Sequence, residues 1–446
     1  MSMLLFLTIF VAINLLYILL GAWSSQGIKD NDDYFLAGRT LGVFALTLTL
    51  IATQLGSNFL LVSSAGAYKS GLWGLAYPLG MSLGFLILGS GFASKLRAFN
   101  VQTTAQLFQT VYLSQKLRMV ASVISIASLW GILLSLVIAS KILLASIGLV
   151  GPLTIILFWA TLIVYTVMGG FKAVVLTDIY QVIMITIIFS GLLVYGLFSD
   201  WSGGTLVALL GNTSSLTSYN FSYISIVSFF IAPALFSLIE QDLAQRFFAA
   251  KTRSIAVIGA LLASLFLTIF AAVPIYFGLK ARALGLILTA NQNPLIVVME
   301  LISHPVIAVL GLCAIAAALT STADSVLCAI SSHAAQDFSP EGKNSLRMSR
   351  FITFIVGISA VGASYTLSAG IGKVLVSSYQ FSIATLFVPI FACFIIKKPR
   401  KGAALGSIVA GIIGFFAASY LCPNLPIEVP SLIASALGFI LGSLVG

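Results

Sequence analysis

The 446-residue chain has the composition of a membrane protein, with 8% charged residues, 60% hydrophobic residues and a mean hydropathy of +1.12. Soluble domains carry about 25% charged residues, so a soluble enzyme, a coiled coil and a disordered tail are excluded. The net charge of +10 is scattered between apolar runs rather than gathered in one segment, and we therefore expect no nucleic-acid partner.

Apolar runs of about 20 residues divide the chain into thirteen predicted membrane-spanning helices. Within a bilayer only helices and closed barrels satisfy their backbone polar groups. We therefore expect an all-α polytopic membrane protein, in which residues 1–446 form a single transmembrane domain in a lipid bilayer. The runs lie at 3–22, 41–67, 71–94, 119–147, 151–169, 171–198, 222–249, 254–278, 303–335, 348–367, 371–396, 402–420 and 430–445.

The basic residues between the runs predict the orientation. With the N-terminus outside, 17 of the 22 Lys and Arg residues fall in inner loops, among them Lys29, Arg118 and Arg246, and only four fall in outer loops. Cytoplasmic loops carry such an excess of Lys and Arg. We therefore expect a multi-pass protein of the cell (inner) membrane with its N-terminus outside and its C-terminus in the cytoplasm.

Side chains typical of enzymes and metal centres are few. The four cysteines have no C-x-x-C spacing, and the two histidines, His304 and His333, stand at opposite ends of one predicted span. Neither histidine lies in a setting that indicates a nucleophile–base pair or a metal centre. We expect a protein that is not an enzyme and that holds no organic cofactor.

We single out two carboxylates inside predicted spans, Asp178 in the sixth and Asp324 in the ninth. A charged residue at the centre of a membrane helix costs about 2.5–3.5 kcal/mol, so each indicates a function. Around Asp324, small and hydroxyl-bearing residues recur at i, i+3, i+4 and i+7 on one helix face. Hard oxygen donors suit an alkali cation, although such small residues also permit close helix packing. The face comprises Ala318, Ser321, Thr322 and Ser325.

Two of the predicted spans are interrupted. The second contains the polar, glycine-containing stretch 51–58, and the seventh contains Pro233. Interrupted helices at membrane depth free backbone carbonyls for cations and turn half-helix ends toward a solute. The spacing between Leu55 and Pro233 is similar to that expected if two five-helix halves repeat.

Four motifs, in order along the chain, resemble those of the sodium:solute symporter family, which has the LeuT-type fold. They are DYFLAGRTLG at 33–42, YTVMGGFKAVVLTD at 165–178, QDLAQRFFAAK at 241–251 and STADS at 321–325. The resemblance covers nearly the whole chain and implies a 5+5 inverted repeat with one extra N-terminal and two extra C-terminal helices. The implied parts are 3–22 for the N-terminal helix, 41–198 and 222–396 for the two repeats, and 402–445 for the C-terminal pair.

The resemblance implies a secondary active transporter that couples the import of a small organic solute to sodium by alternating access. The family's sodium site lies between the second and ninth spans. Carried over, it implies sodium (Na+) as the coupling ion and five ligands. These are the carbonyls of Ala52, Leu55 and Ala318 and the hydroxyls of Ser321 and Thr322.

The sequence does not decide whether there is a second cation site. Some members hold a second sodium at positions that correspond to Asp178, Ser321 and Ser325, with Asp324 beside them. Asp324 can be a ligand, a salt-bridge partner or a protonated donor, so one ion and two ions both remain. A proton-coupled carrier using Asp178 and Asp324 is the alternative within the same fold, and a symporter-like membrane sensor is the alternative outside transport.

The solute is expected near the helix breaks. The family carries sugars, amino acids, monocarboxylates and vitamins. The segment 75–81 holds no carboxylate or amide side chain, and this argues against a sugar as the solute, because hydroxyl-rich ligands need many polar partners. We expect a small amino or organic acid, carried by a protein that functions as a monomer. The candidate binding residues are Gln54, Ser57, Asn58, Tyr77, Met81, Gln241, Tyr379 and Gln380.

Overall fold

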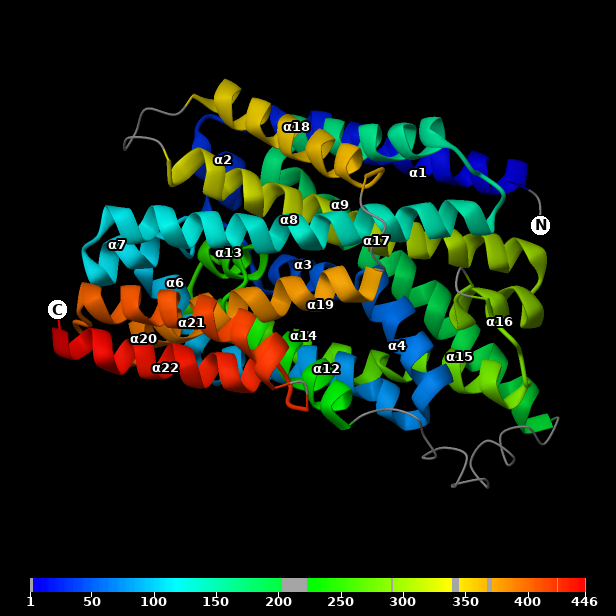
Figure 1. Cartoon of the computed structure of the whole chain (residues 1–446). Helices are drawn as coiled ribbons and strands as arrows, with labels where there is room; N and C mark the ends of the chain where they lie inside the picture. The colour runs from blue at the N-terminus through cyan, green and yellow to red at the C-terminus, as the bar shows by residue number, and fades with distance from the viewer. Residues whose placement is uncertain are drawn as a thin grey trace.

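The computed structural model describes residues 3–202, 223–289, 292–338, 345–366, 371–422 and 424–445. Within these residues the chain forms helices joined by turns, apart from one isolated bridge between Leu41 and Ala250. The long helices lie side by side, and the two termini lie at opposite ends of the bundle (Figure 1). Ten helical segments of this described part are long and apolar enough to cross a membrane, as an all-α polytopic fold requires.

The helices follow the predicted spans closely at most of their ends. In chain order the elements are α1 (Met3–Ser25), α2 (Asn31–Leu36), η1 (Ala37–Arg39), α3 (Val43–Gln54), α4 (Ser57–Ser70), η2 (Gly71–Leu75), α5 (Ala76–Ile87), η3 (Leu88–Phe92), α6 (Ala93–Phe99), α7 (Gln106–Tyr112), α8 (Gln115–Ser146), α9 (Pro152–Ser202), α12 (Tyr223–Phe236), α13 (Gln241–Ala249), α14 (Arg253–Phe270), α15 (Ala272–Ala283), α16 (Pro294–Ile302), α17 (Pro305–Gln336), α18 (Leu346–Ala363), α19 (Ile371–Ser382), η4 (Ile383–Phe387), α20 (Val388–Ile395), α21 (Lys401–Leu421) and α22 (Glu428–Val445).

α9 consists of two helices joined by a reversal at Gly170. This glycine has φ 53° and ψ −147°, a conformation that side-chain-bearing residues rarely adopt, and an added Cβ would lie 2.4 Å from the carbonyl oxygen of Tyr34. Tyr165 before the reversal and Thr177 after it both reach Asp324 through their hydroxyls. The two halves therefore lie side by side, and the predicted boundary between the fifth and sixth spans is confirmed.

Two predicted spans are divided by breaks. α3 ends at Gln54 and α4 begins at Ser57, so the first break falls within the predicted polar stretch. The second lies between the end of α12 and the start of α13 at Gln241. The prediction that this second break falls at Pro233 is wrong. Proline lacks an N–H but keeps its carbonyl, which here accepts the backbone N–H of Ser237 at 3.0 Å, so the chain makes another turn before it breaks.

Hydrogen bonds tie the segment before α3 to the end of α13, and we call this set of contacts the 41–251 clasp. The N–H of Leu41 donates to the carbonyl of Ala249 at 3.1 Å, and the N–H of Lys251 donates back to the carbonyl of Leu41 at 2.9 Å. Nearby, the Gln245 side-chain amide donates to the carbonyl of Phe35 at 2.5 Å. The clasp closes the bundle on the side where α2 and α13 lie, toward the C-terminus in Figure 1.

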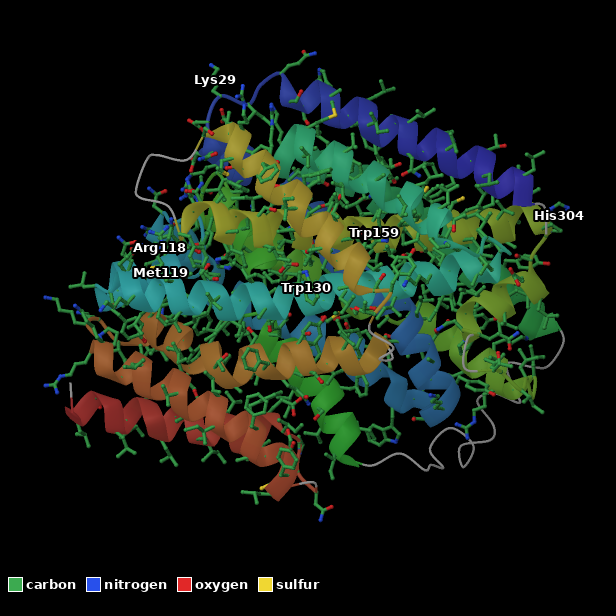
Figure 2. All side chains as sticks on the ribbon, turned by 45° about the horizontal axis from the view of Figure 1, so that its top comes forward. Lys29, Arg118, Met119, Trp130, Trp159 and His304 are labelled. Atoms are coloured by element: carbon green, nitrogen blue, oxygen red, sulfur yellow. The ribbon has the colours of Figure 1, made fainter. Side chains whose placement is uncertain are left out.

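A buried ion pair holds α8 to the end of α17 on the same side of the bundle. The Arg118 guanidinium donates through Nε to Asp337 Oδ1 at 2.8 Å and through Nη2 to the carbonyl of Gln336 at 2.8 Å. The ring nitrogen Nδ1 of His333 lies 2.7 Å from Asp337 Oδ2, and Thr103 donates its hydroxyl to Oδ1 at 2.8 Å. The Asp337 carboxylate therefore anchors three elements. Figure 2 shows Arg118 at this end of the bundle and His304 at the opposite end.

We expect Asp337→Asn to lower stability by about 3–5 kcal/mol at neutral pH, because it leaves Arg118 buried without its partner. Burial acts to raise the pKa of Asp337, but the hydrogen bond and charge of His333 and the charge of Arg118 hold this pKa below its ordinary value. A depressed pKa stabilises above the ordinary pKa of the carboxyl group, and this stabilisation is lost as the pH falls through the native value.

Thermal unfolding of the detergent-solubilised protein between pH 3 and pH 7 measures both effects. The variant should show a lower melting temperature at pH 7 and a smaller loss on acidification than the parent. The control is Asp32→Asn, because Asp32 pairs with Arg39 at the surface, with side-chain exposures of 37% and 15%, where an ion pair is worth about 0–1 kcal/mol. Equal melting temperatures for the two variants would contradict the anchoring role of Asp337.

Candidate functional site

The break between α3 and α4 faces the middle of α17, where hydroxyls and carbonyl oxygens converge. The Ser321 hydroxyl donates to the carbonyl of Ala52 at 3.1 Å and lies 3.0 Å from the carbonyl of Ala318. The Thr322 hydroxyl donates to the carbonyl of Thr53 at 2.9 Å, with the carbonyl of Ala318 at 3.4 Å. Five neutral oxygens from two helices therefore surround one point of contact.

Gly56 allows α17 to approach this closely. Its backbone angles, φ −68° and ψ 175°, are open to any residue, so the requirement for glycine is one of space. An added Cβ would lie 2.1 Å from Thr322 Oγ1 and 3.4 Å from the carbonyl oxygen of Ala318. A side chain at position 56 would thus occupy the space in which these oxygens meet.

The sequence predicted most of the residues that contribute oxygen atoms to this cluster. Ala52, Ala318, Ser321 and Thr322 all contribute atoms to it. Leu55 lies at the end of α3, where its N–H donates to the carbonyl of Ile51 at 2.7 Å. The prediction missed the carbonyl of Thr53, which no side-chain pattern could reveal because the contact depends on the local path of the backbone.

Next to this cluster, Asp178 forms a fully buried ion pair with Arg246. Arg246 Nη2 donates to Asp178 Oδ2 at 2.9 Å and to the Ser325 hydroxyl at 2.6 Å. Thr49 donates its hydroxyl to the same carboxylate oxygen, and Arg246 Nε donates to the carbonyl of Thr49 at 3.0 Å. The guanidinium also lies over the ring of Phe171, 5.3 Å from its centroid. A protein cation therefore already lies between Asp178 and Ser325.

This contact corrects the predicted position of Arg246. The sequence pattern predicts it in an inner loop as a marker of orientation, but it lies in α13 with no exposed surface. The number of basic residues in the predicted inner loops is therefore smaller by one. The misplacement arises because α13 is short and highly amphipathic, so its arginine stands next to loop residues in the sequence while pointing into the bundle.

Asp324 has partners of its own on α9. Tyr165 donates its hydroxyl to Asp324 Oδ2 at 2.6 Å, and the Thr177 hydroxyl lies 3.5 Å from the same oxygen. The Ser325 hydroxyl is 3.4 Å from Oδ1. The carboxylate therefore points from α17 toward α9, and two of the hydroxyls around it, those of Tyr165 and Thr177, come from the two halves of the hairpin at Gly170.

The prediction of only two buried carboxylates within the helices is wrong. Glu240 and Asp242 are buried at the break between α12 and α13, and Glu428 is buried at the start of α22. The Gln54 amide lies 3.4 Å from Glu240 Oε2, so the two helix breaks contact each other through these side chains. An acidic residue is a recognised signal for the start of a helix. The signal was missed here because 222–249 was predicted as one continuous span.

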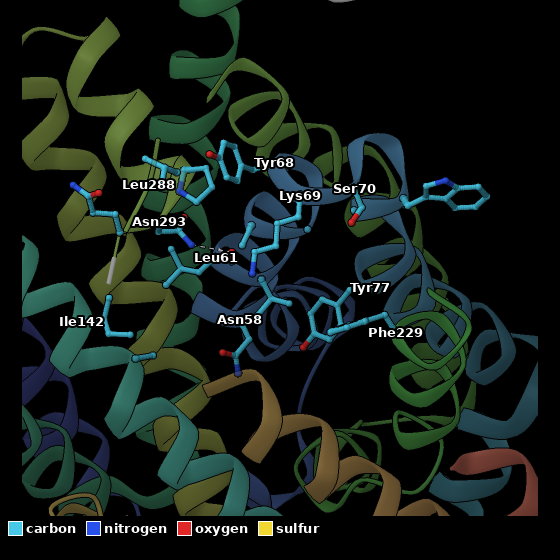
Figure 3. A pocket seen from close by; sticks show the side chains of 18 of the residues that line it. Asn58, Leu61, Tyr68, Lys69, Ser70, Tyr77, Ile142, Phe229, Leu288 and Asn293 are labelled. Atoms are coloured by element: carbon cyan, nitrogen blue, oxygen red, sulfur yellow. Dashed lines mark hydrogen bonds between the residues drawn. The ribbon is translucent and has the colours of Figure 1, made fainter. Parts of the chain in front are cut away.

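A cavity of about 490 Å³ opens beside α4, at the end of the bundle opposite the 41–251 clasp. It is bounded by α4, α5, α8, α12 and the segment leading into α16, and Asn58 and Tyr77 line its deep part (Figure 3). The Tyr77 hydroxyl lies 3.3 Å from that of Tyr379, whose ring stacks on Phe236 at 4.5 Å between centroids. We call this cavity the α4 pocket.

The structure places the predicted solute residues in several separate parts of the bundle. Asn58, Tyr77 and Tyr379 lie at the α4 pocket or just beneath it, and Gln54 lies at the contact between the breaks. Ser57 and Met81 are buried nearby on α4 and α5.

Two of these predicted residues face elsewhere. Gln241 accepts the backbone N–H of Thr104 at 2.7 Å and donates to the carbonyl of Gln102 at 3.0 Å, which ties the start of α13 to the segment before α7. Gln380 donates to Glu428 at 3.0 Å and so faces α22. Neither side chain is directed at the contact between the two helix breaks, because each is held by a partner on another element.

Sequence comparison places this geometry among known proteins. The profile of the Sodium:solute symporter family matches residues 34–411. The chain is 25% identical to the sodium/proline symporter of Salmonella typhimurium over 459 aligned residues, which cover 96% of this chain and 91% of that protein. It is 23% identical to the sodium/sialic acid symporter NanT of Aliivibrio fischeri, over 88% of this chain and 83% of that protein.

A solved structure has the same fold. The chain superposes with a TM-score of 0.83 on the substrate-bound outward-open state of a Na+-coupled sialic acid symporter, at 20% sequence identity. The superposition covers 99% of this chain and 97% of that one. The arrangement of helices and breaks described above is therefore that of a known transporter fold.

Proposed function

The chain belongs to the sodium:solute symporter family and is a sodium-coupled secondary transporter of a small organic solute, and on that premise we propose where its ion and solute bind. Sodium binds where the break between α3 and α4 meets α17. The solute binds between this break and the one that separates α12 from α13. The convergence of the Ser321 and Thr322 hydroxyls on the carbonyls of Ala52 and Thr53 carries the proposal.

The proposed sodium ligands are all uncharged oxygens. Such hard donors suit a monovalent cation, and together they replace much of the hydration shell that the ion leaves behind. Sodium is cargo here, so these residues hold it only in part of the transport cycle. The set comprises the carbonyls of Ala52, Leu55 and Ala318 and the hydroxyls of Ser321 and Thr322.

The ligands come from two separate elements, and this supports a mechanism of coupling. Bound sodium favours the state in which α17 lies against the α3–α4 break, and that state holds the two helix breaks in contact through Gln54 and Glu240. Ion and solute then reinforce each other's binding, as linkage requires. One sodium moving down 100 mV and a tenfold gradient releases about 3.7 kcal/mol, enough for about 500-fold accumulation of a neutral solute.

We further propose that one sodium is carried per solute. A second sodium at Asp178, Asp324 and Ser325 would have to share Asp178 and Ser325 with the Arg246 guanidinium, which already donates to both. Two cations at one carboxylate repel each other strongly in a buried setting. Arg246 therefore serves as the resident counter-ion of Asp178, and Asp324 is held by its hydroxyl partners.

The arrangement in the membrane is also part of this proposal. We propose a LeuT-type inverted repeat with thirteen spans, the N-terminus outside and the C-terminus in the cytoplasm, working as a monomer. The basic loops support this orientation even without Arg246. With it, the α4 pocket opens to the outside and the 41–251 clasp closes the cytoplasmic side, which is an outward-facing state.

Uptake into proteoliposomes tests the function itself. The full-length protein should accumulate its solute when an inward sodium gradient is imposed and should fail to do so with an inward proton gradient at equal sodium. The ratio of 22Na to solute flux should be one. Uptake driven by protons alone would contradict sodium coupling, and a flux ratio of two would contradict the role assigned to Arg246 while leaving sodium coupling intact.

A further inference from the structure

The α4 pocket carries a positive charge that its surroundings do not neutralise. Of the described residues that line it, Lys69 is the one with a charged side chain. The described ion pairs do not include it, and its side chain is exposed to the pocket. Acidic side chains are missing from the described lining, so the pocket is complementary to an anion.

The Lys69 amine is directed into the pocket rather than away from the protein. Lys69 lies in the last turn of α4, where a basic residue also stabilises the helix end. However, helical side chains lean toward the N-terminus of their helix, which points Lys69 down along α4 toward Asn58. Figure 3 shows this direction, with the Lys69 nitrogen on the side of the pocket where Asn58 and Tyr77 lie.

Asn293 and Gln292, two other polar residues of the rim, already have hydrogen-bond partners. Asn293 donates to the carbonyl of Leu61 at 3.0 Å and accepts the Ser64 hydroxyl at 2.9 Å, so it fastens the segment before α16 to α4. Gln292 accepts the backbone N–H of Thr289 at 3.0 Å. The polar groups that face the pocket and can meet a polar solute include the Lys69 amine at the top and Asn58 with the Tyr77 hydroxyl at the bottom.

The spacing of these groups fits a small amphipathic molecule. Lys69 and Asn58 are eleven residues apart on one helix, or about 16 Å along its axis, and the extended lysine side chain spans part of that distance. The wall between them is apolar, formed by Leu61, Val62 and Ile142 with Phe229 opposite. A molecule with an anionic group at one end and an apolar body matches this sequence of surfaces.

We propose that Lys69 receives the anionic group of the solute in the α4 pocket, and that the transported solute is an organic anion, a carboxylate with an apolar body. This proposal rests on the proposed function, because the α4 pocket is taken as the outer access to the solute site. A zwitterionic solute would bring an ammonium group into a pocket whose described lining offers it no carboxylate. Lys69 thus selects the solute before it reaches the helix breaks.

Thermal stabilisation of the purified full-length protein tests the solute class without requiring transport. The probes are butyrate, benzoate and phenylacetate, their neutral amides, and the zwitterions proline and phenylalanine, each with sodium or with choline as the cation. At least one carboxylate should raise the melting temperature in a sodium-dependent manner, and its amide should not. Stabilisation by amides or zwitterions alone, or by none of the carboxylates, would overturn the proposal.

Substitutions then test Lys69 with the carboxylate so identified. Lys69→Gln should weaken its binding about tenfold and raise the KM for uptake by a similar factor with little change in kcat, since the amine lies above the site where transport is driven. Lys69→Arg should retain affinity within about threefold. The effect of Lys69→Gln should shrink in high salt, because screening weakens exposed charge interactions.

The matched control is Lys141→Gln. Lys141 also lies at the outer end of a helix, but its amine donates to the carbonyl of Ser364 at 2.6 Å and lies 3.9 Å from the centroid of the Tyr365 ring, away from the α4 pocket. Equal affinity in parent and Lys69→Gln would overturn the role of Lys69. If sodium alone still stabilises that variant as it does the parent, the proposed sodium site stands independently.

Discussion

Replacing Gly56 with alanine is expected to raise the sodium concentration needed for half-maximal uptake by about 100-fold, or to remove sodium-driven uptake altogether. The new Cβ would lie 2.1 Å from the Thr322 hydroxyl oxygen, so the hydroxyl has to rotate away from the oxygen cluster. Because Gly56 has ordinary backbone angles, the variant should fold, and the loss should be specific to the ion. Sodium dependence of solute uptake in proteoliposomes measures it.

Two further variants make this test specific. Thr322→Ala removes the hydroxyl without filling the space, and should raise the sodium requirement by about tenfold, equivalent to about 1.4 kcal/mol, whereas Thr322→Ser should largely restore it. Gly191→Ala is the matched glycine control, since a Cβ there meets nothing within 4 Å. Normal sodium dependence in Gly56→Ala would place the ion elsewhere, and normal dependence in Thr322→Ala would remove this residue from the ligand set.

Arg246→Gln is expected to destabilise the protein by about 3–5 kcal/mol, because it leaves Asp178 buried without a compensating charge. The guanidinium also donates to Thr49, Ser325 and the carbonyl of Asp242, so several buried acceptors lose a donor together. The expected result is a lower melting temperature in detergent and a lower yield of folded protein in the membrane.

A double-mutant cycle separates the charge effect from the lost hydrogen bonds. Asp178→Asn alone should be destabilising, because it leaves the arginine buried and unpaired. Combining it with Arg246→Gln should recover part of the stability, since the pair can be replaced by neutral groups that hydrogen-bond to each other. Additive losses in the double variant would contradict the pairing. A gain of a second transported sodium in Arg246→Gln alone would show that the Arg246 guanidinium occupies a cation site.

Local features of the sequence predicted most helix ends and the first of the two interruptions, whereas the second break lies beyond Pro233. The polar stretch around Leu55 marked a break, the predicted boundary between spans 151–169 and 171–198 coincides with the reversal at Gly170, and the hydroxyl face of α17 was readable from its helical period. These signals act within a few turns of chain, where backbone sterics and the burial of one helix face decide the structure. Most of the proposed sodium ligands lie on such segments.

Pairings between distant segments could not be predicted in the same way. The partner of Asp178 is 68 positions away, and Arg246 stands beside residues that belong to a loop. Glu240 was hidden because the apolar run around it continues through a break, and Lys69 resembled an ordinary surface lysine until the pocket around it was visible. In each case the decisive property is the opposing side chain, which depends on how the helices pack.

In the proposed orientation, the hydrogen bonds of the 41–251 clasp oppose opening of the bundle on its cytoplasmic side. Its three hydrogen bonds, between Leu41 and Ala249, Lys251 and Leu41, and Gln245 and Phe35, contribute about 0.5–1.5 kcal/mol each. If about 3 kcal/mol must be supplied to break these bonds, fewer than about one empty molecule in a hundred is open on this side at any time. That is close to the energy released by one sodium, so the clasp is weak enough for turnover and strong enough to prevent idle loss of the ion gradient.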